Sequence, residues 1–269
     1  MRRRSVRGAA LDITNAKVAS LAPTWRPYRG VSVLFDNPGT RLPPGVARLE
    51  DIAVVEPERQ RLYDDLACAV ADGDENWGDR HGLCPLPRHS YHVTVCDGPN
   101  QHSGIPSVSA LLDGLPASLE RLTDELVVMA DARVLAVAAD NGVTLAVSEI
   151  VVQGHVLAAR LVPVDPVSDI ALDRIAAARA ELVDGLWTVF RLRTQHWHPH
   201  VSLGYFPNRH AAAAAGAALP TAYQDLPAVL DTSITFASAA VYGFTNMASF
   251  FRVDPDATAL RSHGLGTGR

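Results

Sequence analysis

One short pattern occurs twice in this chain and constrains its fold more than any other feature. The pattern reads YHVTV at residues 91–95 and PHVSL at residues 199–203, so each copy places a histidine two positions before a hydroxyl residue, between apolar neighbours. Alternation with a period of two is typical of a β-strand, in which successive side chains point to opposite faces. Each copy therefore predicts a strand with its histidine and hydroxyl on one face and its valine or leucine side chains in the core.

The histidines and hydroxyls of the two copies form a set suited to one kind of reaction. An imidazole titrates near neutrality and can give or take a proton, and a hydroxyl can donate a hydrogen bond to an anionic oxygen. Two copies facing each other across a cleft would supply a general acid, a general base and two hydroxyl donors around one phosphate, without a metal ion. The candidate catalytic residues are His92 and His200, and the candidate substrate-binding hydroxyls are those of Thr94 and Ser202.

The paired motifs resemble those of the two-histidine (2H) phosphoesterase superfamily, which includes bacterial RNA 2′-5′ ligase-like proteins and cyclic nucleotide phosphodiesterases. The sequences LPRHS at residues 86–90 and GYF at 204–206 add to the resemblance, which spans roughly residues 28–253. Ser202 stands where threonine is commoner in the family, and it keeps the hydroxyl. The resemblance implies an α+β, bilobal fold of the LigT-like type, with two antiparallel sheets, outer helices and a central cleft.

The same resemblance implies an activity and a division of roles. The chain would be a hydrolase, a phosphodiesterase that acts without a metal on a cyclic phosphate or a 2′-5′-type phosphodiester in a nucleotide or RNA end. Resemblance to cyclic phosphodiesterases favours His200 as the general base and His92 as the general acid, and the same histidines could run the step in reverse as a ligation. Tyr205, just after the second motif, is the candidate for stacking on a base, with core packing as the alternative. No cofactor is expected.

Two other functions are compatible with the sequence. His196, His198 and His200 alternate along the chain, so a strand there would bring three imidazoles to one face, as a metal-dependent hydrolase requires. Against this reading, Pro199 interrupts regular strand pairing, and no carboxylate lies at a familiar spacing. The remaining alternative is a non-catalytic module that binds a nucleotide or RNA end in the cleft. Both histidines and both hydroxyls are present, so the sequence does not favour a loss of catalysis.

Charge and composition narrow the class of partner. The net charge is −5 and the pI is about 6.0, which argues against a protein that holds long nucleic acid by neutralising many phosphates. No apolar run has the length of a membrane span, and the basic start MRRR is followed by no signal-like apolar segment. The spacing of Cys68, Cys84 and Cys96 suits neither a disulfide framework nor a zinc site. We expect a cytoplasmic monomer that binds a small nucleotide or an RNA end.

The rest of the sequence predicts the order of the elements around the motifs. We expect an N-terminal arm over residues 1–27 without a catalytic role, a phosphoesterase domain over 28–253 and a flexible tail over 254–269. Turn or loop signals occur at 74–83, 97–99 and 140–142. Besides the motif strands, the predicted strands are 31–35, 133–138, 143–150, 156–164, 233–242 and 248–253, and the predicted helices are 58–71, 107–129, 170–186 and 209–219. Because each half of the chain offers a helix and then a motif strand, the sequence predicts one lobe from each half.

Overall fold

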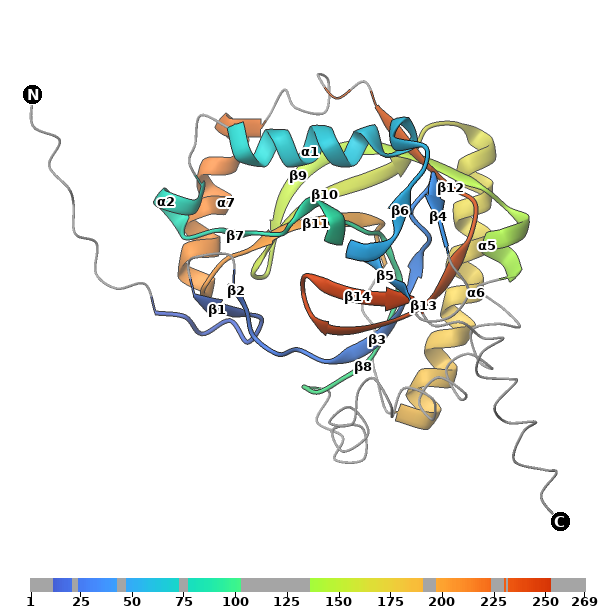
Figure 1. Ribbon diagram of the computed structural model, residues 1–269, viewed down its shortest axis with the longest axis horizontal. Helices are drawn as coiled ribbons and strands as arrows, with labels where there is room; N and C mark the ends of the chain where they lie inside the picture. Colours follow the sequence, from blue (N-terminus) through green and yellow to red (C-terminus); the bar gives the residue numbers. More distant parts are fainter. Residues whose placement is uncertain are drawn as a thin grey trace, which may run out of the picture.

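Two five-stranded antiparallel sheets form the body of the protein, with helices on the outside (Figure 1). The computed structural model describes residues 12–20, 24–42, 47–72, 77–102, 136–190, 197–223, 230 and 232–252. The predictions for residues 1–11, 107–129 and 254–269 lie outside these residues. The predicted fold class, a bilobal α+β fold with two antiparallel sheets, outer helices and a central cleft, is confirmed.

The first sheet carries the second motif. Its strand order is β12-β9-β10-β11-β7, and the second motif forms β11. The strands are β7 (Cys84–Pro85), β9 (Val143–Gln153), β10 (Val156–Pro163), β11 (His200–Tyr205) and β12 (Ser233–Phe236). The hairpin between β9 and β10 turns at Gly154, whose φ of 62° lies in the left-handed region that glycine adopts without strain. The predicted strands 143–150 and 156–164 are therefore confirmed as a hairpin.

The second sheet carries the first motif at its edge. Its strand order is β5-β14-β13-β3-β8, and β8 begins at Thr94. The strands are β3 (Gly30–Phe35), β5 (Ala47–Arg48), β8 (Thr94–Asn100), β13 (Ala239–Asn246) and β14 (Ser249–Arg252). Every residue of β3 is buried, as its run of apolar side chains predicts. Two further antiparallel pairs form separate two-stranded sheets: β1 (Val18–Ser20) with β2 (Thr24–Trp25), and β4 (Thr40–Arg41) with β6 (Ala53–Val54).

The helices cover the first sheet. The described helices are α1 (Arg61–Asp72), α2 (Trp77–His81), α5 (Ala136–Asp140), α6 (Pro166–Phe190) and α7 (Arg209–Tyr223), with short 3-10 turns η1 (Leu49–Asp51), η2 (Pro57–Gln60) and η3 (Arg88–Ser90). Helices α6 and α7 contact β9, and α1 contacts β11 and β12. Helix α6 begins where the Asp165 carboxylate accepts a hydrogen bond from the Ser168 N–H, and it buries Ile175, Leu182 and Leu186. The described helices include none with the length and apolar character that a membrane crossing needs.

The chain crosses between the two sheets just before the first motif. Strand β7 pairs with β11 in the first sheet, and β8, nine residues further on, pairs with β3 in the second. Between them Val93 forms an isolated antiparallel bridge with Val201, so the two motifs meet directly. The second sheet combines strands from both ends of the chain, and the prediction of one lobe from each half is wrong. Long-range pairing of β3 with β13 outweighs the local order of elements.

Three local predictions are wrong for identifiable reasons. The described part of the predicted strand 133–138 belongs to helix α5, and the 140–142 signal ends that helix, because the Asn141 backbone and side chain both donate to the Val137 carbonyl. The predicted turn at 97–99 lies inside β8, where Pro99 is tolerated on an edge strand. The predicted loop 74–83 contains helix α2, which buries Trp77.

Two glycine-to-alanine substitutions should change stability in opposite directions. A Cβ at Gly204 in β11 would lie 2.8 Å from the Cys84 carbonyl oxygen and 3.1 Å from the Pro85 Cα, so β7 would have to shift. We expect Gly204→Ala to lower the free energy of unfolding by about 1–3 kcal/mol. A Cβ at Gly216 in α7 would make an ordinary 3.6 Å contact with Val152, so Gly216→Ala should raise that free energy by about 0.5–1 kcal/mol.

Urea unfolding followed by circular dichroism measures both effects on the same protein. The Gly216→Ala variant is the control, because it makes the same glycine-to-alanine replacement at a position with room for the added Cβ. A Gly204→Ala protein as stable as the parent would show that β7 does not approach β11 as closely as described.

Candidate active site

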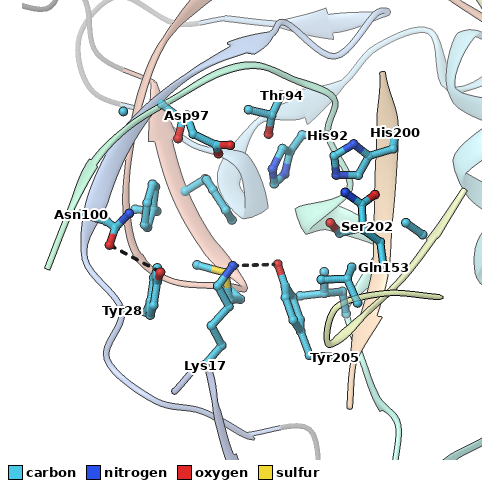
Figure 2. A pocket seen from close by; sticks show the side chains of 18 residues that line it. Lys17, Tyr28, His92, Thr94, Asp97, Asn100, Gln153, His200, Ser202 and Tyr205 are labelled. Atoms are coloured by element: carbon cyan, nitrogen blue, oxygen red, sulfur yellow. Dashed lines mark hydrogen bonds between the residues drawn. The ribbon is translucent and has the colours of Figure 1, made fainter. Parts of the chain in front are cut away.

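A cavity of about 280 Å³ lies between the two sheets, and both motifs line it. The first sheet contributes residues of β9, β10 and β11, and the second contributes residues of β3, β8, β13 and β14. All five residues predicted for the site line this one cavity: His92, Thr94, His200, Ser202 and Tyr205. Figure 2 shows the two imidazoles side by side at one end of the cavity.

Each imidazole is oriented by a carbonyl two residues earlier in the chain. The Nδ1 atom of His92 lies 2.7 Å from the Ser90 carbonyl oxygen, and Nδ1 of His200 lies 2.9 Å from the His198 carbonyl oxygen. A carbonyl only accepts hydrogen bonds, so each Nδ1 carries the proton and donates it. In the neutral form of each ring, Nε2 is then left with its lone pair, ready to accept a proton. The two motifs thus prepare both histidines in the same tautomer.

The side chains within each motif face alternately into the core and into the cavity, as the period of two predicts. Val93, Val95 and Val201 are fully buried, while the Thr94 and Ser202 side chains line the cavity (Figure 2). The antiparallel bridge at Val93 and Val201 places Thr94 level with His200 and His92 level with Ser202. Each histidine therefore has a hydroxyl residue of the other motif beside it.

A tryptophan and an arginine hold the outer edge of the first motif strand. The Trp197 indole donates to the Thr94 carbonyl at 2.8 Å, and Nε of Arg179 donates to the Val95 carbonyl at 2.8 Å. The Arg179 guanidinium also lies over the Trp197 ring, 5.8 Å from its centroid. Because Trp197 lies three residues before His200, these bonds connect the backbone of one motif to the approach of the other.

The surroundings of His92 favour its neutral form. Burial lowers its pKa from 6.5 to about 4, and repulsion from His200 and Lys17 adds to this, against the opposing effect of the Ser90 carbonyl bond. The Phe250 ring packs against the imidazole at 4.4 Å between centroids. His92 is therefore neutral at physiological pH, and a neutral imidazole suits a base. This direction favours His92 as the base, opposite to the assignment that the family resemblance implies.

Of the aromatic side chains in and near the second motif and in β13, some line the cavity and others lie in the core. Tyr205 lines the cavity, and its hydroxyl lies 3.3 Å from Nζ of Lys17. Phe244 also lines the cavity, at the opposite sheet. Phe206 is fully buried, and the Tyr242 hydroxyl donates to the buried Asp36 carboxylate at 2.7 Å, so both belong to the core.

Sequence reasoning missed several polar residues that line the cavity. They are Lys17, Tyr28, Asp97, Asn100 and Gln153 (Figure 2). Lys17 lies in the segment that was predicted as an arm without a catalytic role. A compositional signal could have found it, because it is the single lysine among the 24 lysine and arginine residues of the chain.

The alternative histidine cluster is described only in part. His196 lies outside the described residues, and the His198 side chain is exposed. Within the described residues, no group of three or more histidine, cysteine, aspartate or glutamate side chains has the arrangement of a metal site.

Comparisons with known proteins support the fold and do not extend to function. No family model and no curated protein matches the chain. A conserved protein of unknown function from Agrobacterium tumefaciens is similar in structure, with a TM-score of 0.52 and 14% identity over 87% of this chain and 88% of that one. E. coli LigT is similar at lower scores: 0.43 and 12% identity for the complex with 3′-AMP (84% of this chain, 95% of that one), and 0.42 and 11% for the complex with phosphate (85% and 95%). The score of 0.52 supports a shared fold with the Agrobacterium protein, and the lower scores support no conclusion about this chain.

The protonation state of His92 can be measured directly. In long-range ¹H–¹⁵N correlation spectra at pH 7, we expect a neutral His92 with its proton on Nδ1, because of the Ser90 carbonyl bond. On acidification its signals should titrate well below pH 6.5, toward about 4. The His200→Ala variant should titrate at a higher pH than the parent, because one source of repulsion is removed. A His92 that titrates near pH 6.5 in the parent would contradict the buried environment.

Proposed function

We propose that this protein is a metal-independent phosphodiesterase of the 2H type, which hydrolyses a cyclic phosphate or a 2′-5′-type phosphodiester in a nucleotide or RNA end. The observation that supports this most is the pair of imidazoles, each held by its Nδ1–H, that face one cavity beside two hydroxyl residues. Acid–base catalysis at phosphorus needs one proton acceptor and one proton donor on opposite sides of the reacting phosphate. His92 and His200 approach the cavity from the two sheets and can fill these positions.

The lowered pKa of His92 supports a division of roles between the histidines. Neutral His92 takes a proton from the attacking water through Nε2, and protonated His200 gives a proton to the leaving ribose oxygen. The water oxygen forms a bond to phosphorus as the bond to the ribose oxygen breaks, so the proton count balances over one turnover. The hydroxyls of Thr94 and Ser202 donate hydrogen bonds to the non-bridging oxygens, where negative charge grows in the transition state.

Hydrolysis of a nucleoside 2′,3′-cyclic phosphate in the presence of EDTA tests the proposal. We expect activity that survives chelation, and we expect His92→Ala and His200→Ala each to lower kcat by about 10²–10⁴-fold, the contribution of a positioned acid or base. The exposed His210 in α7 provides a control of the same chemical type, and His210→Ala should keep the parent rate.

The His198→Ala variant separates this proposal from the metal alternative. Its backbone carbonyl still holds His200, so a metal-independent phosphodiesterase should retain activity. Activity that is lost to EDTA, restored by zinc or manganese and abolished in His198→Ala would place the reaction at His196, His198 and His200 instead. A parent protein that binds a nucleoside 3′-phosphate but turns over no cyclic phosphate would be a binding module.

The dependence of kcat/KM on pH tests the two protonation states. His92 acts as a base only when it is neutral, and it gains a proton as pH falls toward about 4, so the acid limb should lie well below pH 6.5. The alkaline limb arises when the general acid loses the proton that it must donate. We therefore expect a bell-shaped profile that stays active at mildly acidic pH. A rate that rises continuously to alkaline pH would rule out this division of roles.

A further inference from the structure

The single lysine of the chain lies in the cleft, enclosed by two tyrosines. Nζ of Lys17 lies 5.0 Å from the centroid of the Tyr28 ring, 4.7 Å from that of Tyr205 and 3.3 Å from the Tyr205 hydroxyl. Figure 2 shows the ammonium group pointing into the cavity that His92 and His200 face. Cation–π attraction from two rings fixes the ammonium in place.

Contacts to both sheets position this lysine. The backbone N–H groups of Thr14 and Asn15 donate to the Pro207 carbonyl, and the Asn15 amide donates to the Phe206 carbonyl at 2.8 Å, just beyond β11. Asn15 also accepts a hydrogen bond from the Lys17 N–H at 3.0 Å. On the other side, the N–H of Tyr28 donates to the Thr245 carbonyl of β13. Hydrogen bonds to both sheets thus hold the segments that carry Lys17 and Tyr28.

The ammonium keeps its charge without an ion-pair partner among the described residues. Burial alone would lower the pKa of Lys17, but the oxygens of Tyr205 and Tyr28 and the Asp97 carboxylate outweigh it, and the pKa is raised. Of the three N–H donors, one is used by the Tyr205 hydroxyl. Asp97 acts on the ammonium only from beyond ion-pair distance, and an anionic ligand in the cavity would bring a counter-charge into direct contact with it.

We propose that Lys17, with Tyr28 and Tyr205, forms a subsite for a second phosphate group of the substrate, separate from the phosphodiester held between His92 and His200. This inference rests on the proposed function and specifies its substrate class: a molecule with two phosphates. The subsite selects a phosphorylated nucleotide over a nucleoside that carries only the cyclic phosphate.

Three features of the subsite favour a phosphate distinct from the reacting one. The reacting phosphate already has two imidazoles and two hydroxyls, whereas Lys17 reaches the cavity from a different segment of the chain. A lysine ammonium is a point charge that binds a phosphate from any direction. The Tyr205 hydroxyl accepts from Lys17 and can donate its own proton to the same anion.

Calorimetric binding of two probes tests the subsite independently of turnover. The probes are a nucleoside 3′-monophosphate and the corresponding 3′,5′-bisphosphate. For the parent protein we expect the bisphosphate to bind about tenfold to hundredfold more tightly, the value of a hydrogen-bonded charged contact. Lys17→Met should remove this advantage while the monophosphate affinity changes less than about twofold. Lys17→Gln, which keeps a polar end, should show the same loss and provides a second variant if the first unfolds.

Arg26→Met is the matched control, because Arg26 is exposed and its N–H pairs with the Lys17 carbonyl in the same β1–β2 hairpin. Arg26→Met removes one positive charge at the residue that pairs with Lys17. This variant should still bind the bisphosphate more tightly than the monophosphate. An equal loss of affinity for both probes in Lys17→Met would overturn the subsite and assign Lys17 to the reacting phosphate. A parent protein with no preference for the bisphosphate, or no binding of it, would overturn it as well. If the preference is found and no cyclic phosphate is hydrolysed, the subsite stands and the proposed reaction fails.

Discussion

The antiparallel contact between Val93 and Val201 is the constraint on which the rest of the site depends. Both valines are fully buried, and their bridge joins an edge of one sheet to the interior of the other. Because side chains alternate along each strand, burying these two valines together forces the neighbouring histidines and hydroxyls into the cavity. A slip of one residue in either motif would bury a histidine and expose a valine, which the core does not permit. The packing of two apolar side chains therefore determines the geometry of the polar ones.

Two nearly identical motifs become chemically different through their surroundings. The local bond from Nδ1 to a carbonyl two residues earlier is the same in both, so the motif itself specifies the tautomer. The difference comes from distant residues: Phe250 of β14 covers His92, and Lys17 adds positive charge near it. Burial and repulsion then keep His92 neutral. Two motifs that are alike in sequence thus place their imidazoles in different surroundings.

The sequence predicted what depends on local periodicity and missed what depends on distant pairing. The period of two gave the correct faces for Val93 and Val201, and helical periodicity gave α6. The sequence did not show that β3 pairs with β13, and so the lobes were assigned to the wrong segments. It also missed Lys17, because the segment before β1 has little regular structure of its own and is held by bonds to the Phe206 and Pro207 carbonyls. Such bonds leave no pattern in the local sequence. Only the count of lysines pointed toward this residue.

Lysine and arginine have different positions in this chain: arginines form ion pairs within the framework of the protein, and the single lysine lines the cavity. Arginine forms several of the described ion pairs, such as Arg88 with Asp64, Arg160 with Glu149 and Arg252 with buried Asp36. The guanidinium plane suits such fixed contacts, whereas an ammonium is compact and can be met from several directions. Lys17 has two tyrosine rings where the arginines have carboxylates. Although the net charge of the chain is −5, its single lysine therefore brings a positive charge to the wall of the cavity.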